Sequence, residues 1–200
     1  MPDMTTDRLP FTGDDAADRF LASDPLALLI GFELDQQVTV QKAFSGPSEI
    51  RARLGHLNAG RIAAMPLDDL VEVFRTPPAI HRFPGSMAGR VQELCRAIAD
   101  DYGNDASRVW SEASSGKDLE ARLLGLPGIG PMKASTLVAI LATRFDVRPP
   151  GWEAVMPTHP TLADVDSPES LADYQAGKRA RKAEAKAQAA AKGAGSAKTR

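Results

Sequence analysis

The sequence contains a single cysteine and no long apolar stretch. Cys95 alone excludes an internal disulfide and any iron–sulfur cluster held by four cysteines. No apolar run approaches the roughly 20 residues that a membrane-spanning helix needs, and the acidic first residues are unlike a signal peptide. The three histidines, at positions 56, 81 and 159, lack the spacing of metal ligands. We therefore expect a cytoplasmic protein without a metal centre and without a membrane partner.

Charge is divided unevenly along the chain. Residues 176–200 carry eight basic residues and one acid, a net charge of +7, whereas the rest carries 16 basic and 25 acidic residues, a net charge of −9. A negative body repels nucleic acid, and a basic segment attracts it. The segment is rich in Ala and Lys and has no large apolar side chain, so we expect it to be disordered or a solvated helix. It serves either as a solubilising tail or as an arm that binds phosphates.

The body of the chain is predicted to be all-α. Apolar residues recur every three or four positions along 85–101, and no segment alternates with the period of a strand. We expect a flexible arm over residues 1–13, a helical domain over 14–175 and the basic tail over 176–200. Helices are expected from Pro25, over 47–54, 58–64, 66–74, 85–101, 104–110 and 115–124, from Pro131, and from Pro168.

The most informative stretch is LPGIGPMKA, residues 126–134, between two predicted helices. Gly128 and Gly130 allow positive φ and a close approach to the backbone. Their N–H groups, with those of the following helical turn, can cradle a phosphate. Ile129 is expected to anchor the turn in the core, and Lys133 to place a cation near the bound anion. The alternative is a tight turn whose glycines have no other role.

This stretch resembles the helix–hairpin–helix motif of DNA-binding proteins. Residues 29–39 (LIGFELDQQVT) resemble the early helix of helix–hairpin–helix DNA glycosylases, the superfamily of endonuclease III. Residues 85–101 are similar to the helix that lies between those two motifs. The resemblance implies a two-lobed helical glycosylase-like fold, a monomer, and duplex DNA as the partner of a nucleoid-associated protein.

The resemblance also assigns roles to residues that contact DNA. Such enzymes turn a damaged or mismatched base out of the duplex and into a pocket. Gln37, with Gln36 beside it, is expected to fill the gap that the base leaves. Hairpin residues hold the DNA backbone, and Trp152 is a candidate for stacking on a base. The expected hairpin contacts are Gly128, Ile129, Gly130, Met132 and Lys133, and a monovalent cation at the hairpin carbonyls is the one cofactor implied.

The chemistry that the resemblance implies needs a carboxylate beside the bond between base and sugar. Pro150 stands where the family carries its aspartate, so Asp146 and Glu153 are the nearest candidates. Glu33, an acid on a very apolar predicted helix, is a further candidate, which we expect either to extend its carboxylate to solvent or to pair with a basic residue.

Strand cleavage would need a lysine nucleophile as well. Met132 stands at the position of that lysine, and Lys133 lies about 100° further around the helix. We therefore expect base removal without lyase activity. Two alternatives stay open: a DNA-binding module of the same fold without catalysis, and an all-α domain that binds a basic protein.

Overall fold

A computed structural model describes the backbone of residues 6–196, and the side chains up to residue 184 except those of 181 and 182. Across residues 6–196 the chain is all-helical and has no strand. The helices are α1 (Asp15–Ser23), α2 (Pro25–Leu34), α3 (Val40–Leu54), α4 (Ala59–Ala64), α5 (Leu67–Arg75), α6 (Pro84–Tyr102), α7 (Arg108–Ser111), α8 (Gly116–Leu124), α9 (Pro131–Arg144) and α10 (Pro168–Ser196), with two 3₁₀ turns, η1 (Trp152–Val155) and η2 (Leu162–Asp164).

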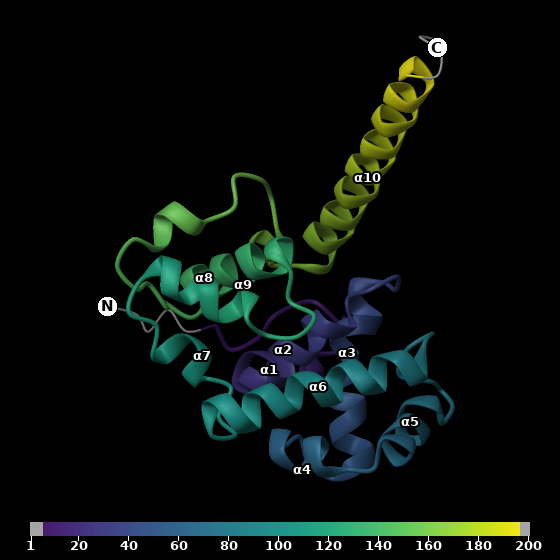
Figure 1. Ribbon diagram of the computed structural model, residues 1–200, viewed down its shortest axis with the longest axis vertical. Helices are drawn as coiled ribbons and strands as arrows, with labels where there is room; N and C mark the ends of the chain where they lie inside the picture. Colours follow the sequence, from purple (N-terminus) through teal and green to yellow (C-terminus); the bar gives the residue numbers. More distant parts are fainter. Residues whose placement is uncertain (1–5, 197–200) are drawn as a thin grey trace.

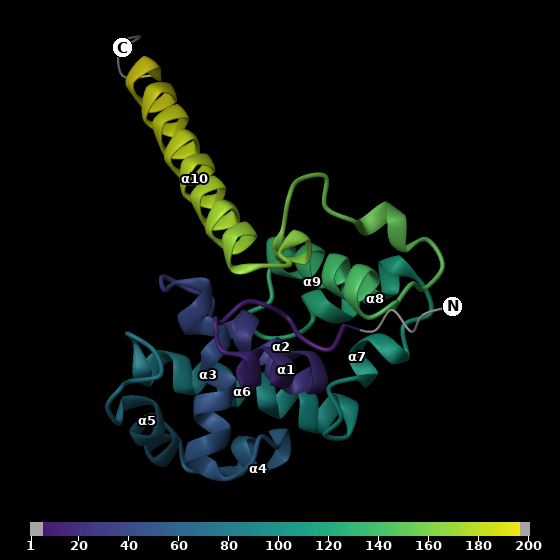
Figure 2. The same cartoon turned by 180° about the vertical axis from the view of Figure 1, so that it is seen from behind.

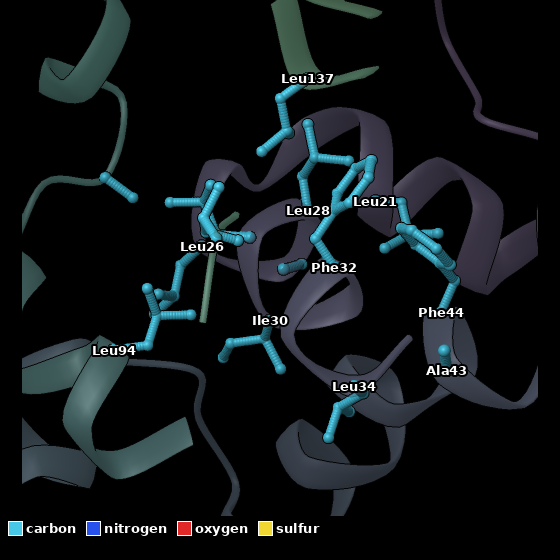
Figure 3. Packing of buried hydrophobic residues seen from close by; sticks show 14 of the residues in the cluster. Leu21, Leu26, Leu28, Ile30, Phe32, Leu34, Ala43, Phe44, Leu94 and Leu137 are labelled. Carbon is cyan, nitrogen blue, oxygen red and sulfur yellow. The ribbon is translucent and has the colours of Figure 1, made fainter. Parts of the chain in front are cut away.

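Helix α2 is the centre of the core. Every residue from Leu26 to Leu34 is buried, because this helix is apolar on all its faces. The carboxylate of Asp24 begins the helix by accepting hydrogen bonds from the N–H groups of its first turn. Figure 3 shows its side chains meeting Phe44 of α3, Leu94 of α6 and Leu137 of α9. Helices α4 and α5 pack in turn on α6.

Most predicted helices are present with small shifts, and α3 is the largest difference. Gly46 and Pro47 signal a helix start, yet α3 begins earlier, after Thr39, whose hydroxyl accepts from the N–H of Lys42. Pro47 cannot donate to the preceding turn, which weakens a helix. Both residues are buried, so packing against the core outweighs the lost bond. The helix expected over 104–110 is shorter and covers Arg108–Ser111.

The expectation of a flexible arm over residues 1–13 is wrong for residues 9–12. Leu9 and Phe11 are buried. The buried carboxylate of Asp18 accepts hydrogen bonds from the N–H groups of Phe11, at 3.1 Å, and Thr12, at 2.9 Å. The two apolar side chains therefore belong to the core. Residues 1–5 lie outside the described chain.

Helices α8 and α9 form an antiparallel pair joined by the turn at 125–130, and α10 projects away from the rest of the molecule (Figures 1 and 2). The basic tail expected over 176–200 is described as far as residue 196, where it continues α10 as a helix. No helix within residues 6–196 combines the length and apolarity needed to cross a bilayer.

Candidate nucleic-acid interface

The turn between α8 and α9 uses its two glycines differently. Gly128 has φ +76°, in the left-handed region that favours glycine, whereas Gly130 has φ −86° and needs no such freedom. Ile129, between them, is buried, and its N–H donates to the carbonyl of Leu126 at 3.2 Å. The predicted anchoring role of Ile129 therefore fits its position. The expectation of positive φ holds for Gly128 and is wrong for Gly130.

The turn presents a set of free backbone donors. Within residues 6–196 the N–H groups of Gly128, Gly130, Met132 and Lys133 have no hydrogen-bond partner. The last two belong to the first turn of α9, and no side chain caps that helix. Gly130 and Met132 are exposed to solvent. Unpaired donors at the positive end of a helix of this length are suited to an anion such as phosphate.

A buried carboxylate lies directly beneath this turn. Glu33, near the end of α2, has no exposed surface. Its Oε1 accepts a hydrogen bond from Gln36 Nε2 at 3.2 Å and lies 3.9 Å from Arg90 Nη1. Its Oε2 has no partner within the described chain. A Cβ added at Gly128 would overlap that same Oε2. Gly128 is therefore required both for its backbone angle and for the space that Glu33 occupies.

Burial shifts the pKa values of Glu33 and Lys133 in the directions that disfavour their charged forms. Burial raises the pKa of the Glu33 carboxyl, and the positive charges of Lys133 and Arg90 oppose that rise. Burial lowers the pKa of the Lys133 ammonium, and the charge of Glu33 opposes that fall. The two groups therefore stabilise each other's charge without fully offsetting the loss of water.

Lys133 turns inward, although its place on the helix predicts that it points away from the reacting position. Its Nζ donates to the carbonyl of Gly128 at 3.1 Å, whereas Met132 is 69% exposed.

The Gln36–Gln37 loop is held from three sides. Gln36 Nε2 also donates to the backbone carbonyl of Glu33 at 3.0 Å, and Arg90 Nη1 donates to Gln36 Oε1 at 3.2 Å. His81 Nδ1 accepts from the N–H of Phe83, so its Nε2 carries the proton and donates to the Gln36 carbonyl at 3.0 Å. Gln37, which follows, is exposed and has φ +57°. The loop thus fixes Gln36 and presents Gln37 to solvent.

The sequence contained little sign of the residues that support this loop. His81 lies in a proline-rich segment without metal-ligand spacing, yet it is buried, and burial lowers its pKa. Arg90 lies on the solvent side of a regular amphipathic helix, with nothing local to mark it. Both residues contact Gln36 from about 50 positions away in the sequence, at separations of 45 and 54.

A surface pocket of about 360 Å³ opens between the start of α6 and the hairpin turn. No side chain caps α6, and within the described chain the N–H groups of Gly85 and Ser86 have no partner. The pocket thus combines free donors, a cation and two acids. Its lining residues are Glu33, Gly85, Ser86, Gly89, Arg90, Glu93, Pro127 and Gly128.

The structure does not bring Asp146, Trp152 and Glu153 together with the hairpin turn. Asp146 follows the far end of α9, whose 14 residues span about 20 Å. The N–H of Gly116 donates to the carbonyl of Pro150 at 2.9 Å, which places the loop before Trp152 at the start of α8. The turn lies at the opposite end of both helices.

Each of these three residues has solvent or a cation as its neighbour. Asp146 is exposed and lies 3.1 Å from Arg148 Nη1. The guanidinium of Arg148 also lies over the Trp152 ring, 5.5 Å from its centre. Glu153 is exposed. This end of the helix pair is an ordinary solvated surface.

Helix α10 is tied to the glutamine loop about three turns after its start. Lys178 Nζ lies 3.1 Å from the carboxylate of Asp35, the residue before Gln36. Lys178 and Arg179 line a surface pocket with Gln37 and its neighbours. The basic helix therefore leaves the body beside Gln37.

The hairpin carbonyls, where a monovalent cation is expected, accept hydrogen bonds within the protein. Gly128 accepts from the Lys133 ammonium, Leu126 from the N–H of Ile129, and Gly130 from the N–H of Ala134. A metal ion would compete with these donors, and with a fixed positive charge at Gly128. Elsewhere in the described chain no three His, Cys, Asp or Glu side chains gather as metal ligands would. Cys95 is buried among apolar side chains, which raises the pKa of its thiol to about 12.

Neither the protein-family models, nor the curated proteins, nor the solved structures contain a match to this chain.

Proposed function

We propose that this protein binds duplex DNA through the α8–α9 turn and removes a base from it. The observation that carries the proposal is the set of free N–H groups at the exposed LPGIG turn and the first turn of α9. Backbone donors of this kind hold a phosphate without reading sequence. A repair enzyme needs such contacts, because its target lies in any sequence.

The surroundings of the turn supply the other parts that base removal needs. Gln37 is exposed on a loop held by Gln36, so it is placed to fill a vacated base stack. The pocket at the start of α6 offers donors and acceptors to a base turned out of the duplex. The basic α10 leaves the body beside Gln37 and adds affinity that does not depend on sequence.

The arrangement of helices supports a glycosylase-like fold. Helix α2 packs with α3 and α6, and Leu137 of α9 points toward it from a third direction (Figure 3). We propose that these groups correspond to the two lobes of such a fold, with the pocket between them. Met132, in place of a lysine nucleophile, favours hydrolysis of the base–sugar bond without strand cleavage.

Binding is tested by placing a negative charge at the turn. Gly130→Glu meets no neighbouring atom, because the space beside Gly130 is open, so the protein should fold. The new carboxylate should repel a phosphate and lower duplex affinity at least tenfold. Ala52→Glu, at an exposed position of α3, is the matched control and should change affinity by less than twofold. Equal effects of the two variants would argue against the hairpin as the interface.

Base removal is tested on duplexes that each carry uracil, hypoxanthine, 8-oxoguanine or an alkylated purine. Alkali after incubation cleaves the strand at any abasic site. Release of at least one base supports the proposal, and scission without alkali would reveal lyase activity. Duplex binding without release of any base would support the non-catalytic DNA-binding module instead, and absence of binding would support a protein-interaction domain.

A further inference from the structure

Burial of the Glu33 carboxylate costs free energy that its neighbours only partly offset. Among the buried polar side chains it is a carboxylate without any exposed surface, in a helix that is otherwise apolar. A charge removed from water is stabilised by a close ion pair or by several hydrogen bonds. Glu33 has one side-chain hydrogen bond, at Oε1, and a cation at 3.9 Å, while Oε2 has no partner in the described chain. An unsatisfied buried acceptor calls for an explanation, and Glu33 shares this property with Glu49 and His56 in the described chain.

The ion pair with Arg90, at 3.9 Å from Oε1, leaves Oε2 without a partner in the described chain. The guanidinium of Arg90 donates its hydrogen bond to Gln36 Oε1 rather than to Glu33. The ammonium of Lys133 donates to the Gly128 carbonyl. Both cations therefore favour the charged form of the Glu33 carboxylate, but neither of them donates a hydrogen bond to Oε2.

The place of Oε2 is what points to a reaction. It lies against the backbone of Gly128, an exposed residue without a side chain, and Glu33 forms part of the wall of the pocket at the start of α6. A strand that binds the turn amides engages the same few residues that cover the carboxylate. A shift of that turn on binding would expose Oε2 to the pocket.

We propose that Glu33 is the carboxylate that assists cleavage of the bond between base and sugar; this inference rests on the proposed function. The expected acids Asp146 and Glu153 lie at the opposite end of α9, beyond reach of the pocket. Glu33 comes instead from α2, ahead of the glutamine loop. It therefore approaches the reacting sugar from the side of Gln37.

The reaction balances as a hydrolysis. The bond from C1′ of the sugar to the base nitrogen breaks, and its electron pair leaves with the base. The oxygen of a water molecule forms the new bond to C1′. Glu33, in its charged form, opposes the positive charge that develops on the sugar, accepts a proton from that water and passes it to the departing base. Glu33 ends the cycle as it began.

Several groups set the charge of Glu33. Lys133 and Arg90 favour the charged carboxylate, Gln36 does so through its hydrogen bond, and Glu93 opposes it. Because burial outweighs them and raises the Glu33 pKa above its ordinary 4.5, the rate of base release should fall on acidification at a pH above that value.

Binding of charged and neutral sugar mimics tests the inference without knowing the base. One duplex carries a pyrrolidine abasic analogue, which is cationic as the sugar is during cleavage, and the other carries neutral tetrahydrofuran. The wild-type protein should bind the first at least tenfold more tightly. Glu33→Gln should remove that preference while its affinity for the tetrahydrofuran duplex stays within threefold. Glu72→Gln, at an exposed position of α5, is the control and should keep the preference.

The outcomes separate the two proposals. If the protein binds duplex DNA but Glu33→Gln retains the preference, or if Asp146→Asn or Glu153→Gln removes it, the role of Glu33 is overturned and DNA binding stands. If the wild type binds both mimics equally, the role of Glu33 is likewise overturned. If neither duplex is bound, or Gly130→Glu leaves affinity unchanged, the proposed function itself fails. Where a base is released, Glu33→Gln should also slow its release at least a hundredfold.

Discussion

The two ends of the α8–α9 pair hold acidic residues in opposite states. At the hairpin end, Glu33 has no exposed surface and one oxygen without a partner in the described chain. At the far end, Asp146 is exposed and lies 3.1 Å from Arg148, and Glu153 is exposed. The carboxylates at the far end retain their water and cost the fold little. Unfavourable burial is thus concentrated at the end where the backbone also presents free donors.

Asp146 and Glu153 are close to the hairpin in sequence, yet the carboxylate with the unusual surroundings is Glu33, which is distant in sequence. Functional sites are where proteins keep groups that packing alone would remove. The hairpin end has the signs of such a site: an unsatisfied carboxylate, a lysine with a lowered pKa, and a non-glycine residue, Gln37, in the left-handed region. The far end shares one of them, since Asp146 also has positive φ.

The largest effect is expected at Gly128. Gly128→Ala forces a side chain into positive φ and into the space of Glu33 Oε2, so the free energy of unfolding should fall by about 3 kcal/mol. Gly130→Ala, two residues further on at φ −86° with open space beside it, should change it by less than about 0.5 kcal/mol. Urea denaturation of both variants measures the contrast.

The steric part of that loss can be separated from the backbone part. In a Glu33→Ala background the overlap is gone, so Gly128→Ala should cost about 1–2 kcal/mol less than in the wild type. The remainder is the strain of positive φ. Equal costs in both backgrounds would mean that Glu33 and Gly128 are not in contact.

The second effect concerns the pH dependence of stability. The pKa of Glu33 is raised in the folded protein, so its contribution is fully present below the ordinary value of 4.5 and is lost as pH rises through the folded pKa. Near pH 7, Glu33→Gln should therefore raise the free energy of unfolding by about 1–3 kcal/mol, the cost of an unsatisfied buried charge. Below pH 4.5 the variant and the wild type should converge.

The far side of the molecule supplies the control for that pH series. Glu72→Gln, exposed on α5, should differ from the wild type by less than about 0.5 kcal/mol at either pH. A stabilisation by Glu33→Gln that is equal at both ends of the pH range would show that its cause is not the buried charge.

The third effect compares Gln37 and Asp146, two of the three non-glycine residues with positive φ in the described chain. Gln37→Gly and Asp146→Gly each relieve a left-handed backbone, which should stabilise the protein by about 0.5–1 kcal/mol before other losses. Only Gln37→Gly should also weaken binding to a duplex that contains an abasic site, by about tenfold. Equal affinities of the two variants would remove Gln37 from the DNA interface.

The smallest change in stability is expected from truncation after Lys178. It keeps the contact between Lys178 and Asp35 and removes seven basic residues and one acid, none of them from the core. The free energy of unfolding should change by less than about 0.5 kcal/mol. Duplex affinity should become less dependent on salt concentration, because fewer phosphates are neutralised. An unchanged salt dependence would mean that α10 does not touch DNA.

Local signals predict most of the fold, and packing between distant segments explains the exceptions. Caps and apolar spacing predict α6, α8 and α9 within one or two residues, because these signals depend on neighbouring positions alone. The start of α3 escapes them, because burial of Pro47 overrides its effect on the helix. Leu9 and Phe11 lie in a polar segment, and nothing local indicates that they are buried.

The candidate site is predictable only where it is continuous in sequence. The hairpin and the glutamine pair are each a short motif, and the chain alone indicates both. Their meeting point is not a motif: Glu33 touches Gly128 from across the fold, and His81 and Arg90 reach Gln36 from two other segments. Asp146 and Glu153 follow the hairpin closely in sequence, but the length of α9 carries them away from it.

The bonds that hold Gln36 have a kinetic consequence. A flexible loop must lose conformational entropy when a ligand orders it, which slows productive encounters and weakens affinity. Here the loop is already ordered through its carbonyl and its side-chain amide before any partner arrives. Gln37 is therefore presented in advance, and under the proposed function the protein would probe each step of a long duplex without waiting for the loop to form.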